Sequence, residues 1–282
     1  MSSHRAVAST AIQFLPNLLR AAAQVIRCRL RSFGFLAVVP IIAGCDQPNT
    51  QVVQSAPTAR PTQSKTGVVI MLPGVEGGAW QLAEARAGLA EAGVHDEIDT
   101  IEWGARPFGS LVNLMDLKAN RQRAQDIAER ITTRLRAEPD RRIQLVGYSG
   151  GGGLALLVTE ALPTDVKLDR LVLIAAAVAP THDLGPALAQ CRRGIVNFHS
   201  EEDWFILGVG TRTFGTIDRV QSDSAGRIGF RTAEGQPLAR PGLTQVAWRD
   251  DWRKLGHFGG HIGWLARGWS REVLGPALTK QS

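Results

Sequence analysis

The distribution of apolar residues predicts alternating strands and helices over most of the chain. Continuous apolar runs bounded by turn residues are typical of strands that helices cover on both faces. Between these runs, residues 79–92 and 119–137 have the composition and spacing expected of helices. Strands that alternate with helices favour an α/β fold, with a mostly parallel sheet and helices on both of its faces. The predicted strands are residues 67–72, 98–103, 143–146, 168–177, 194–199 and 245–248, and residues 208–244 are expected to form loops or a small hairpin.

The amino-terminal part of the chain follows a different pattern. Arg27, Arg29 and Arg31 precede an apolar run at residues 33–42, which is followed by small residues up to position 44. A positive segment, an apolar segment of about ten residues and small residues at its end are typical of a secretory signal. A transmembrane helix needs about 20 apolar residues, so this run is too short for one. We therefore predict a signal peptide at residues 1–44.

The end of this leader carries a further signal. Its last residues, Ile-Ala-Gly-Cys at 42–45, resemble the bacterial lipobox, which implies that Cys45 is lipidated and becomes the new amino terminus. The alternative is an ordinary secretory leader with a cysteine there by chance. Residues 45–65 are rich in Gln, Thr, Ser, Ala and Pro, which predicts a flexible tether. We expect residues 66–282 to form the folded domain, anchored to a membrane of the bacterial cell envelope.

Charge and cysteine content narrow the possible partners. Five of the 32 Lys and Arg residues and none of the 26 Asp and Glu residues lie in 1–44, which leaves 27 basic and 26 acidic residues for the rest. A nearly neutral body gives no argument for nucleic-acid binding. Cys191 is the last cysteine after position 45, and no Cys/His cluster has the spacing of metal ligands. We expect no metal and no cofactor.

The chemistry of the chain is concentrated at residues 147–151, Gly-Tyr-Ser-Gly-Gly, which match G-x-S-x-G. An apolar strand precedes this motif and an apolar, helix-like run at 154–158 follows it, as a nucleophile elbow requires. Glycine at 147 and 151 removes side chains that would collide with the strand or the helix at so sharp a turn. The glycine-rich stretch does not fit a dinucleotide or P-loop motif, because no G-x-G-x-x-G or Gly-Lys-Ser/Thr is present. A purely structural glycine-rich turn is the remaining alternative.

With these residues the chain resembles the α/β-hydrolase family, and the resemblance implies a nucleophile, an acid and a histidine in that order. Ser149 is then the nucleophile. The acid is expected after the strand at 194–199, where Asp203 is preferred over Glu201 and Glu202. Asp183, after the preceding strand, is a second location for the acid.

The base is expected near the end of the chain, in a loop that holds two histidines. His261 follows two glycines and precedes an apolar, helix-like run, which resembles the Gly-His arrangement before the last helix of the family. We prefer it to His257, and we expect His182 and His199 to be structural or surface residues.

The resemblance also implies two backbone donors for an oxyanion. The first is the N–H of Gly150, which directly follows the nucleophile. The second comes from the loop after the first strand, where Pro73-Gly74-Val75 stands in the place of the family's His-Gly-x, so we expect the N–H of Val75, with Glu76 as the alternative. The missing histidine is a departure from the family pattern.

Together these features predict a serine hydrolase that cleaves carboxylic esters through Ser149, His261 and Asp203. An acyltransferase or a thioesterase would use the same residues, and a non-catalytic, envelope-anchored binding lipoprotein could keep the same fold. Only about 18 residues separate the strand that ends near 177 from the strand that begins near 195, where family members often insert a cap. A short connection predicts an open site, suited to small-molecule or polymer-bound esters.

Overall fold

The computed structural model of the protein describes residues 67–94, 96–104, 116–203, 216–218 and 222–279. The proposed signal peptide, Cys45 and the tether lie outside these residues. The part of the chain that is described contains no helix long and apolar enough to cross a membrane. Its strands are β1 (Gly67–Leu72), β2 (Glu97–Thr100), β3 (Arg142–Tyr148), β4 (Arg170–Ile174), β5 (Ile195–His199) and β6 (Leu243–Ala247).

These strands form one sheet in the order β2-β1-β3-β4-β5-β6, and every neighbouring pair is parallel. The longer helices are α2 (Ala83–Glu91), α4 (Leu117–Ala137) and α5 (Gly150–Glu160). The predicted α/β fold, a parallel sheet with helices on both faces, is therefore confirmed. The shorter helices are η1 (Ala79–Leu82), α6 (Gly185–Ala189), α8 (Ala225–Ile228), η3 (Asp250–Leu255), η4 (His261–Leu265), α9 (Arg267–Trp269), η5 (Ser270–Leu274) and α10 (Gly275–Thr279).

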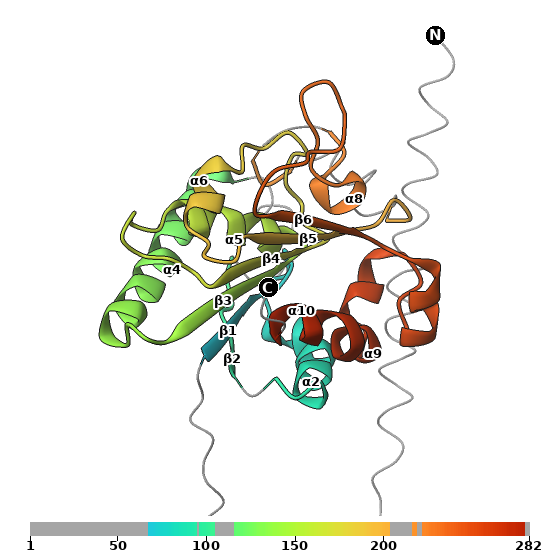
Figure 1. Cartoon of the computed structure of the whole chain (residues 1–282), viewed down its shortest axis with the longest axis horizontal. Coiled ribbons are helices and arrows are strands. Elements are labelled where there is room, and N and C mark those ends of the chain that lie inside the picture. Colours follow the sequence, from blue (N-terminus) through green and yellow to red (C-terminus); the bar gives the residue numbers. More distant parts are fainter. Residues whose placement is uncertain (1–66, 95, 105–115, 204–215, 219–221, 280–282) are drawn as a thin grey trace, which may run out of the picture. The chain divides into compact units, whose positions relative to one another are not determined.

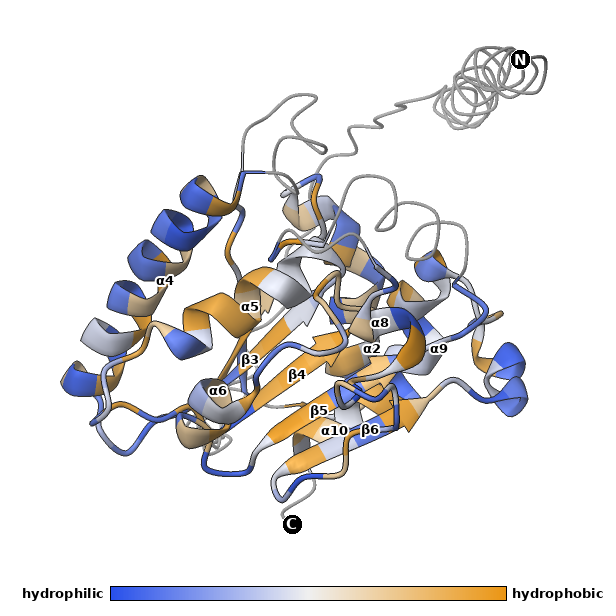
Figure 2. Ribbon diagram, turned by 90° about the horizontal axis from the view of Figure 1, so that it is seen from above, coloured by the Kyte–Doolittle hydropathy of each residue, from blue (hydrophilic) through white to orange (hydrophobic). Residues whose placement is uncertain are grey.

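Alternation of side chains along each strand creates two apolar cores. In β1, Val68, Ile70 and Leu72 face the core that α4 and α5 complete, whereas Val69 and Met71 face the core on the other side. Helices α2, α9 and α10 cover this second face (Figure 1). The outer surface of α4 is hydrophilic, while the strands between the helices are apolar (Figure 2). Strands covered on both faces carry apolar residues at successive positions, which is why the apolar runs predicted them.

Several predicted boundaries differ from the observed ones. The predicted strand at 168–177 shortens to β4, because Ala175 adopts a positive φ of 48° and turns the chain. The predicted helix at 79–92 opens with the 3-10 turn η1, and the predicted strand at 98–103 ends at Thr100. In the described part of residues 208–244, the short helix α8 is followed by a single antiparallel bridge between Arg231 and Pro237.

The order of the strands fixes where a site can form. From β1 the chain moves to β2 on one side, and it then returns to place β3 on the other side of β1. In parallel sheets, ligands bind beyond the carboxyl ends of the strands at such a reversal. The loops after β1 and β3 meet there.

Candidate active site

Ser149 lies in the sharp turn between β3 and α5. Its backbone has φ 56° and ψ −123°, a conformation that a residue with a Cβ rarely adopts. Hydrogen bonds hold the turn on both sides: the Ser149 N–H donates to the Ile174 carbonyl (2.9 Å), and the Ser149 carbonyl accepts from Gly152 (2.9 Å) and Ala177 (3.0 Å). The surrounding backbone therefore determines the strained conformation, and the Ser149 side chain stands at the amino terminus of α5.

Two glycines let α5 approach the sheet so closely. A Cβ at Gly147 would come within 3.0 Å of Gly152 at the start of α5, and a Cβ at Gly151 would come within 3.0 Å of the carbonyl groups of Leu72 and Pro73. The prediction that both positions exclude a side chain is thus supported. The collision at Gly151 is with the neighbouring strand β1, rather than with the strand that leads into the turn.

The structure brings Ser149, His261 and Asp203 together in one chain of hydrogen bonds. His261 Nε2 lies 2.9 Å from Ser149 Oγ, and His261 Nδ1 lies 2.5 Å from Asp203 Oδ2. Donation from Nδ1–H to the carboxylate leaves Nε2 as the acceptor for the serine hydroxyl. Ser149 is 7% exposed and Asp203 2%, so little water competes for these bonds.

Further contacts fix the loops that carry the acid and the base. The Ser200 hydroxyl donates to the carbonyl of Gly259 (2.7 Å), which joins the loop after β5 to the loop before η4. The Asp203 N–H donates to the Ser200 carbonyl (3.1 Å). The Tyr148 hydroxyl donates to the His261 carbonyl (3.1 Å). Burial and the nearby Asp203 carboxylate raise the pKa of Tyr148, which keeps its phenol a donor.

His257, the alternative base, occupies a different environment. It is fully buried, its ring centre lies 4.1 Å from that of Trp264, and the rings of Trp252 and Trp269 are near it too. Burial lowers the pKa of His257 to about 3, and the neutral ring accepts a hydrogen bond at Nδ1 from the N–H of Gly259 (3.2 Å). No hydrogen bond joins it to Ser149 or Asp203, and it packs among these tryptophans.

The alternative acids also lie elsewhere. Glu201 and Glu202 are exposed, next to the buried Asp203. Asp183 accepts a hydrogen bond from the N–H of Gly185 (2.9 Å) and pairs with Arg240 (3.4 Å) on the surface. None of these three carboxylates is bonded to His261 in the described part of the chain.

The expected oxyanion donors belong to segments that touch. A Cβ built at Gly150 would lie 3.4 Å from the backbone nitrogen of Val75, so the loop after β1 lies directly over the first turn of α5. Glu76, the alternative donor, is exposed on the outer side of this loop.

Trp103 holds this loop, and the sequence did not reveal its role. Its indole N–H donates to the Pro73 carbonyl (2.7 Å), and its backbone N–H donates to the carbonyl of Gly77 (3.2 Å). The Gly77 N–H in turn donates to the carbonyl of Gly74 (2.8 Å), which closes the turn. An apolar residue at the end of a predicted strand gives no signal for such a contact, because it depends on the neighbouring strand.

His182 forms a half-buried ion cluster with Glu160 and Asp218. Its ring lies 2.7 Å from Glu160 and 3.0 Å from Asp218. Burial by itself opposes protonation, but the hydrogen bonds to these two carboxylates raise the pKa of His182 to about 9. The cluster ties the end of α5 to the segment at 216–218, which is the structural role expected for this histidine. Among the described residues, no group of three or more His, Cys, Asp or Glu side chains could hold a metal ion.

No family model matches the chain, and no curated protein matches its sequence. Among solved structures, it is similar to the mature lipase BlEst2 of Bacillus licheniformis, with 14% identity, 80% of this chain and 96% of that chain covered, and a TM-score of 0.45. It is also similar to a predicted CIB-like hydrolase of Thermoplasma acidophilum (16% identity, 77% and 88% covered, TM-score 0.42). A third is the thioesterase RedJ of Streptomyces coelicolor (15% identity, 76% and 86% covered, TM-score 0.39).

Proposed function

We propose that this protein is a serine hydrolase of the α/β-hydrolase type that cleaves carboxylic esters. The hydrogen-bonded chain from Asp203 through His261 to Ser149 is the observation that carries this proposal. A serine hydroxyl is a weak nucleophile, and it needs a base within hydrogen-bond reach and an acid that orients the base. The 2.9 Å and 2.5 Å separations satisfy both requirements.

In the first step, Ser149 Oγ attacks the ester carbonyl carbon while its proton passes to His261 Nε2. Asp203 stabilises the imidazolium that forms. The carbonyl oxygen becomes an oxyanion, and the backbone N–H groups of Gly150 and Val75 are its donors in this proposal. The intermediate then expels the alcohol, which takes the proton from His261 and leaves an acyl group on Ser149.

In the second step, water repeats the same sequence. His261 removes a proton from the water, the hydroxide attacks the acyl group, and the intermediate releases the carboxylic acid while the proton returns to Ser149. The amino terminus of α5 favours the negative charge that develops in both steps, because its backbone N–H groups point toward the Ser149 side. Water as the acceptor makes the reaction a hydrolysis.

The proposal is tested by labelling and by turnover. We expect a fluorophosphonate probe to label the wild type and not the Ser149→Ala variant. We expect the same variant to lower kcat/KM for p-nitrophenyl esters by at least about 10⁴-fold, with water as the only acceptor present. Ser222→Ala, which truncates a serine outside the site, is the matched control. No labelling of the wild type, or labelling that persists in Ser149→Ala, would remove the serine-hydrolase proposal.

We also propose that the enzyme works in the bacterial cell envelope, anchored to a membrane through lipidated Cys45. The arginine-flanked apolar run and the Ile-Ala-Gly-Cys sequence at 42–45 support this location. The tether at 45–65 would separate the anchor from the catalytic domain at 66–282.

A further inference from the structure

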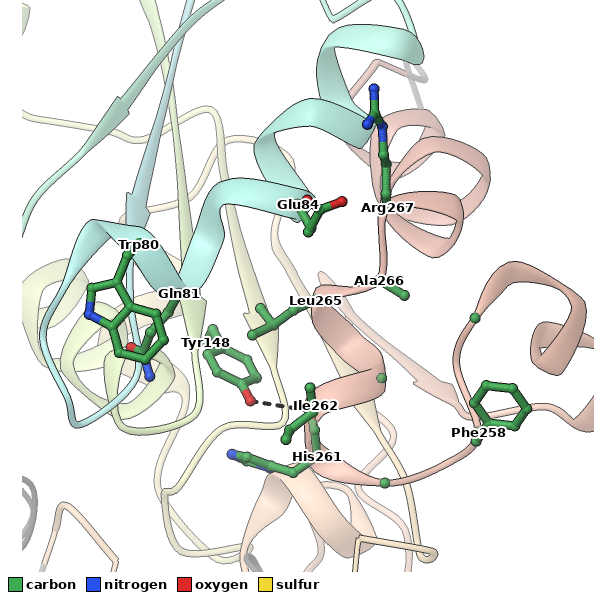
Figure 3. Close-up of a pocket in the computed structure, with 13 residues that line it drawn as sticks. Trp80, Gln81, Glu84, Tyr148, Phe258, His261, Ile262, Leu265, Ala266 and Arg267 are labelled. Atoms are coloured by element: carbon green, nitrogen blue, oxygen red, sulfur yellow. Dashed lines mark hydrogen bonds between the residues drawn. The ribbon is translucent and has the colours of Figure 1, made fainter. Parts of the chain in front are cut away.

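The large apolar side chains that are exposed gather at one place in the described part of the chain. Trp80 is 70% exposed, Phe258 65% and Ile262 80%. All three line the same groove, which has a volume of about 990 Å³ (Figure 3). Single exposed apolar residues need no explanation, but a group around one hollow is typical of a binding surface.

The groove lies between two segments that are far apart in the sequence. One wall comes from η1 and the start of α2, with Trp80, Gln81 and Glu84, and the opposite wall comes from residues 256–267, with Ile262 and Leu265 (Figure 3). Among the described residues that line the groove, Glu84 and Arg267 are the only Asp, Glu, Lys or Arg side chains. Arg267 already pairs with Glu91, so the groove offers no cluster of positive charge to an anionic ligand.

The groove adjoins the catalytic candidates through His261. His261 itself lines it, and so does Tyr148, the residue directly before Ser149. The Tyr148 ring lies 5.1 Å from the His261 ring, and its hydroxyl is bonded to the His261 carbonyl (Figure 3). A substrate whose ester group reaches Ser149 therefore has an apolar channel beside it for the rest of the molecule.

The exposed indole of Trp80 has a defined place on the wall. A Cβ at Gly78 would come within 3.0 Å of the indole of Trp80, so the ring is folded back against the backbone of Gly78. Gly78 belongs to the same loop that Trp103 holds over α5. The wall of the groove and the proposed oxyanion loop are thus one connected segment.

The apolar lining of the groove distinguishes between classes of ester. An acetyl or methyl group is too small to cover the exposed side chains of Trp80, Phe258 and Ile262, whereas a long alkyl chain or an aromatic group would cover part of them. Covering apolar surface is favourable in proportion to the area removed from water.

We propose that this groove binds the apolar chain of the substrate, so that the enzyme prefers esters with a long alkyl or an aromatic group over short-chain esters. This inference rests on the proposed function, because it assigns the substrate class of the same site. The occupant is the substrate itself, since the groove opens onto His261 and no charged cluster of the described residues marks it for another ligand.

Two series of esters test the inference, both used below their micelle concentrations. In the first, the acyl chain of p-nitrophenyl esters grows from acetate to octanoate, and in the second the alcohol of an acetate ester grows from methyl to octyl. We expect kcat/KM to rise about two- to fourfold per methylene in one series, the usual gain for burying a CH₂ group. The series that rises identifies which part of the ester lies in the groove. Flat profiles in both series would overturn the inference.

Variants of the walls give a second measurement that does not depend on how much protein is folded. Trp80→Ala and Ile262→Ala each remove apolar surface from one wall. We expect each to lower the ratio of kcat/KM between the octyl-chain and the shortest ester by at least about fivefold. Glu129→Ala, on the exposed face of α4, should leave that ratio unchanged. An unchanged ratio in both wall variants would contradict the inference.

A binding measurement separates failure of this inference from failure of the proposed function. Calorimetric titration of Ser149→Ala with decanoate and with acetate needs no turnover. We expect decanoate to bind at least about tenfold more tightly than acetate, and Trp80→Ala in the same background to reduce this difference. If the wild type hydrolyses short esters and Ser149→Ala binds both acids with equal affinity, the proposed function is retained and the proposed role of the groove is rejected. If the wild type shows no hydrolysis but Ser149→Ala binds decanoate selectively, the proposed function is rejected and the groove is retained as an apolar binding site.

Discussion

His257 and His261 lie four residues apart and meet opposite environments. The ring of His257 is enclosed by tryptophans and is neutral, whereas His261 lies between the Asp203 carboxylate and the Ser149 hydroxyl. Between them, Gly259 has a φ of 91°, a left-handed conformation that favours glycine. A proton on His257 therefore opposes folding, and a proton on His261 is part of the proposed chemistry.

One prediction follows for the stability of the protein in acid. The pKa of His257 is about 3 in the folded protein and 6.5 when the residue is solvated, so the unfolded state binds the extra proton between these values. Stability is fully present above pH 6.5 and falls as the pH drops toward 3, by up to about 1.4 kcal/mol per pH unit from this residue. Asn at position 257 keeps an acceptor near Nδ1 but cannot titrate.

Urea unfolding at several pH values between 4 and 7 measures this slope. We expect a shallower slope in His257→Asn than in the wild type, with hydrolysis retained by the folded fraction. His261→Asn, the matched variant, should stay folded at pH 7 and lose hydrolysis. Equal slopes in the wild type and His257→Asn would show that His257 does not titrate as its burial requires.

The catalytic candidates could be predicted from the sequence, but the residues that hold their loops in place could not. Ser149 stands in a local motif, and the order of the remaining candidates along the chain favoured Asp203 and His261, whose geometry the structure now provides. Ser200 and Trp103 act through atoms of distant backbone, at Gly259 and Pro73. No local pattern encodes such contacts, because they exist only once the sheet has formed.

At the scale of elements, the turn between β3 and α5 is packed closely against the neighbouring strand β1. Helix α5 rests on the carbonyl groups at the end of β1, with no room for a side chain at Gly151. Strands and helices themselves were predictable from apolar runs, since most strands are covered on both faces. The ends of these elements were harder to predict. Strand β4 stops at Ala175, which has an unusual positive φ. This conformation depends on the neighbouring strand β5, because the Ala175 N–H donates to the Phe198 carbonyl.

The packing at this turn predicts a large difference between two glycine substitutions. Gly151→Ala places a methyl group against backbone that cannot move without shifting β1, so we expect a loss of more than about 3 kcal/mol in the free energy of unfolding, or no folded protein. Gly260→Ala is the control, because Gly260 has a φ of −80° and no atom within 4 Å of its added Cβ. There we expect a change within about 1 kcal/mol.

Urea midpoints of the two purified variants, compared with the wild type, provide the measurement. Circular dichroism of Gly151→Ala shows whether any folded protein remains. A Gly151→Ala protein as stable as Gly260→Ala would mean that α5 can move away from β1, and the account of the turn given above would be wrong.

At the scale of the whole molecule, the parallel sheet gathers groups that lie far apart in the sequence. Ser149 follows β3, Asp203 follows β5 and His261 follows β6, and all three strands end at the same edge of the sheet. His261 is 112 residues from Ser149 and 58 from Asp203. The alternation of strands and helices predicts this edge in advance, while the groove beside it depends on side chains that meet only in three dimensions.

The proposed anchor also belongs to this scale. We expect the protein expressed in a bacterium to carry lipid and to partition into the detergent phase, and Cys45→Ser to lose both properties, because serine has no thiol to carry the lipid that holds the mature protein on the membrane. Mass spectrometry of the mature protein and Triton X-114 partitioning measure this. Cys191→Ser, which changes the cysteine of the folded domain, should behave as the wild type. Lipid on Cys45→Ser, or none on the wild type, would contradict the anchor.

The first turn of α5 restricts which substitutions this protein can accept. A Cβ at any position from 150 to 153 would come within 3.0 Å of a neighbouring segment, among them Val75, Pro73, Ala176 and Ile217. Side chains immediately behind Ser149 therefore have little room to vary. Under the proposed function, we expect new specificities to arise in the facing walls around residues 80–84 and 258–266, where a combinatorial library confined to those codons would change the groove without altering the turn at Ser149.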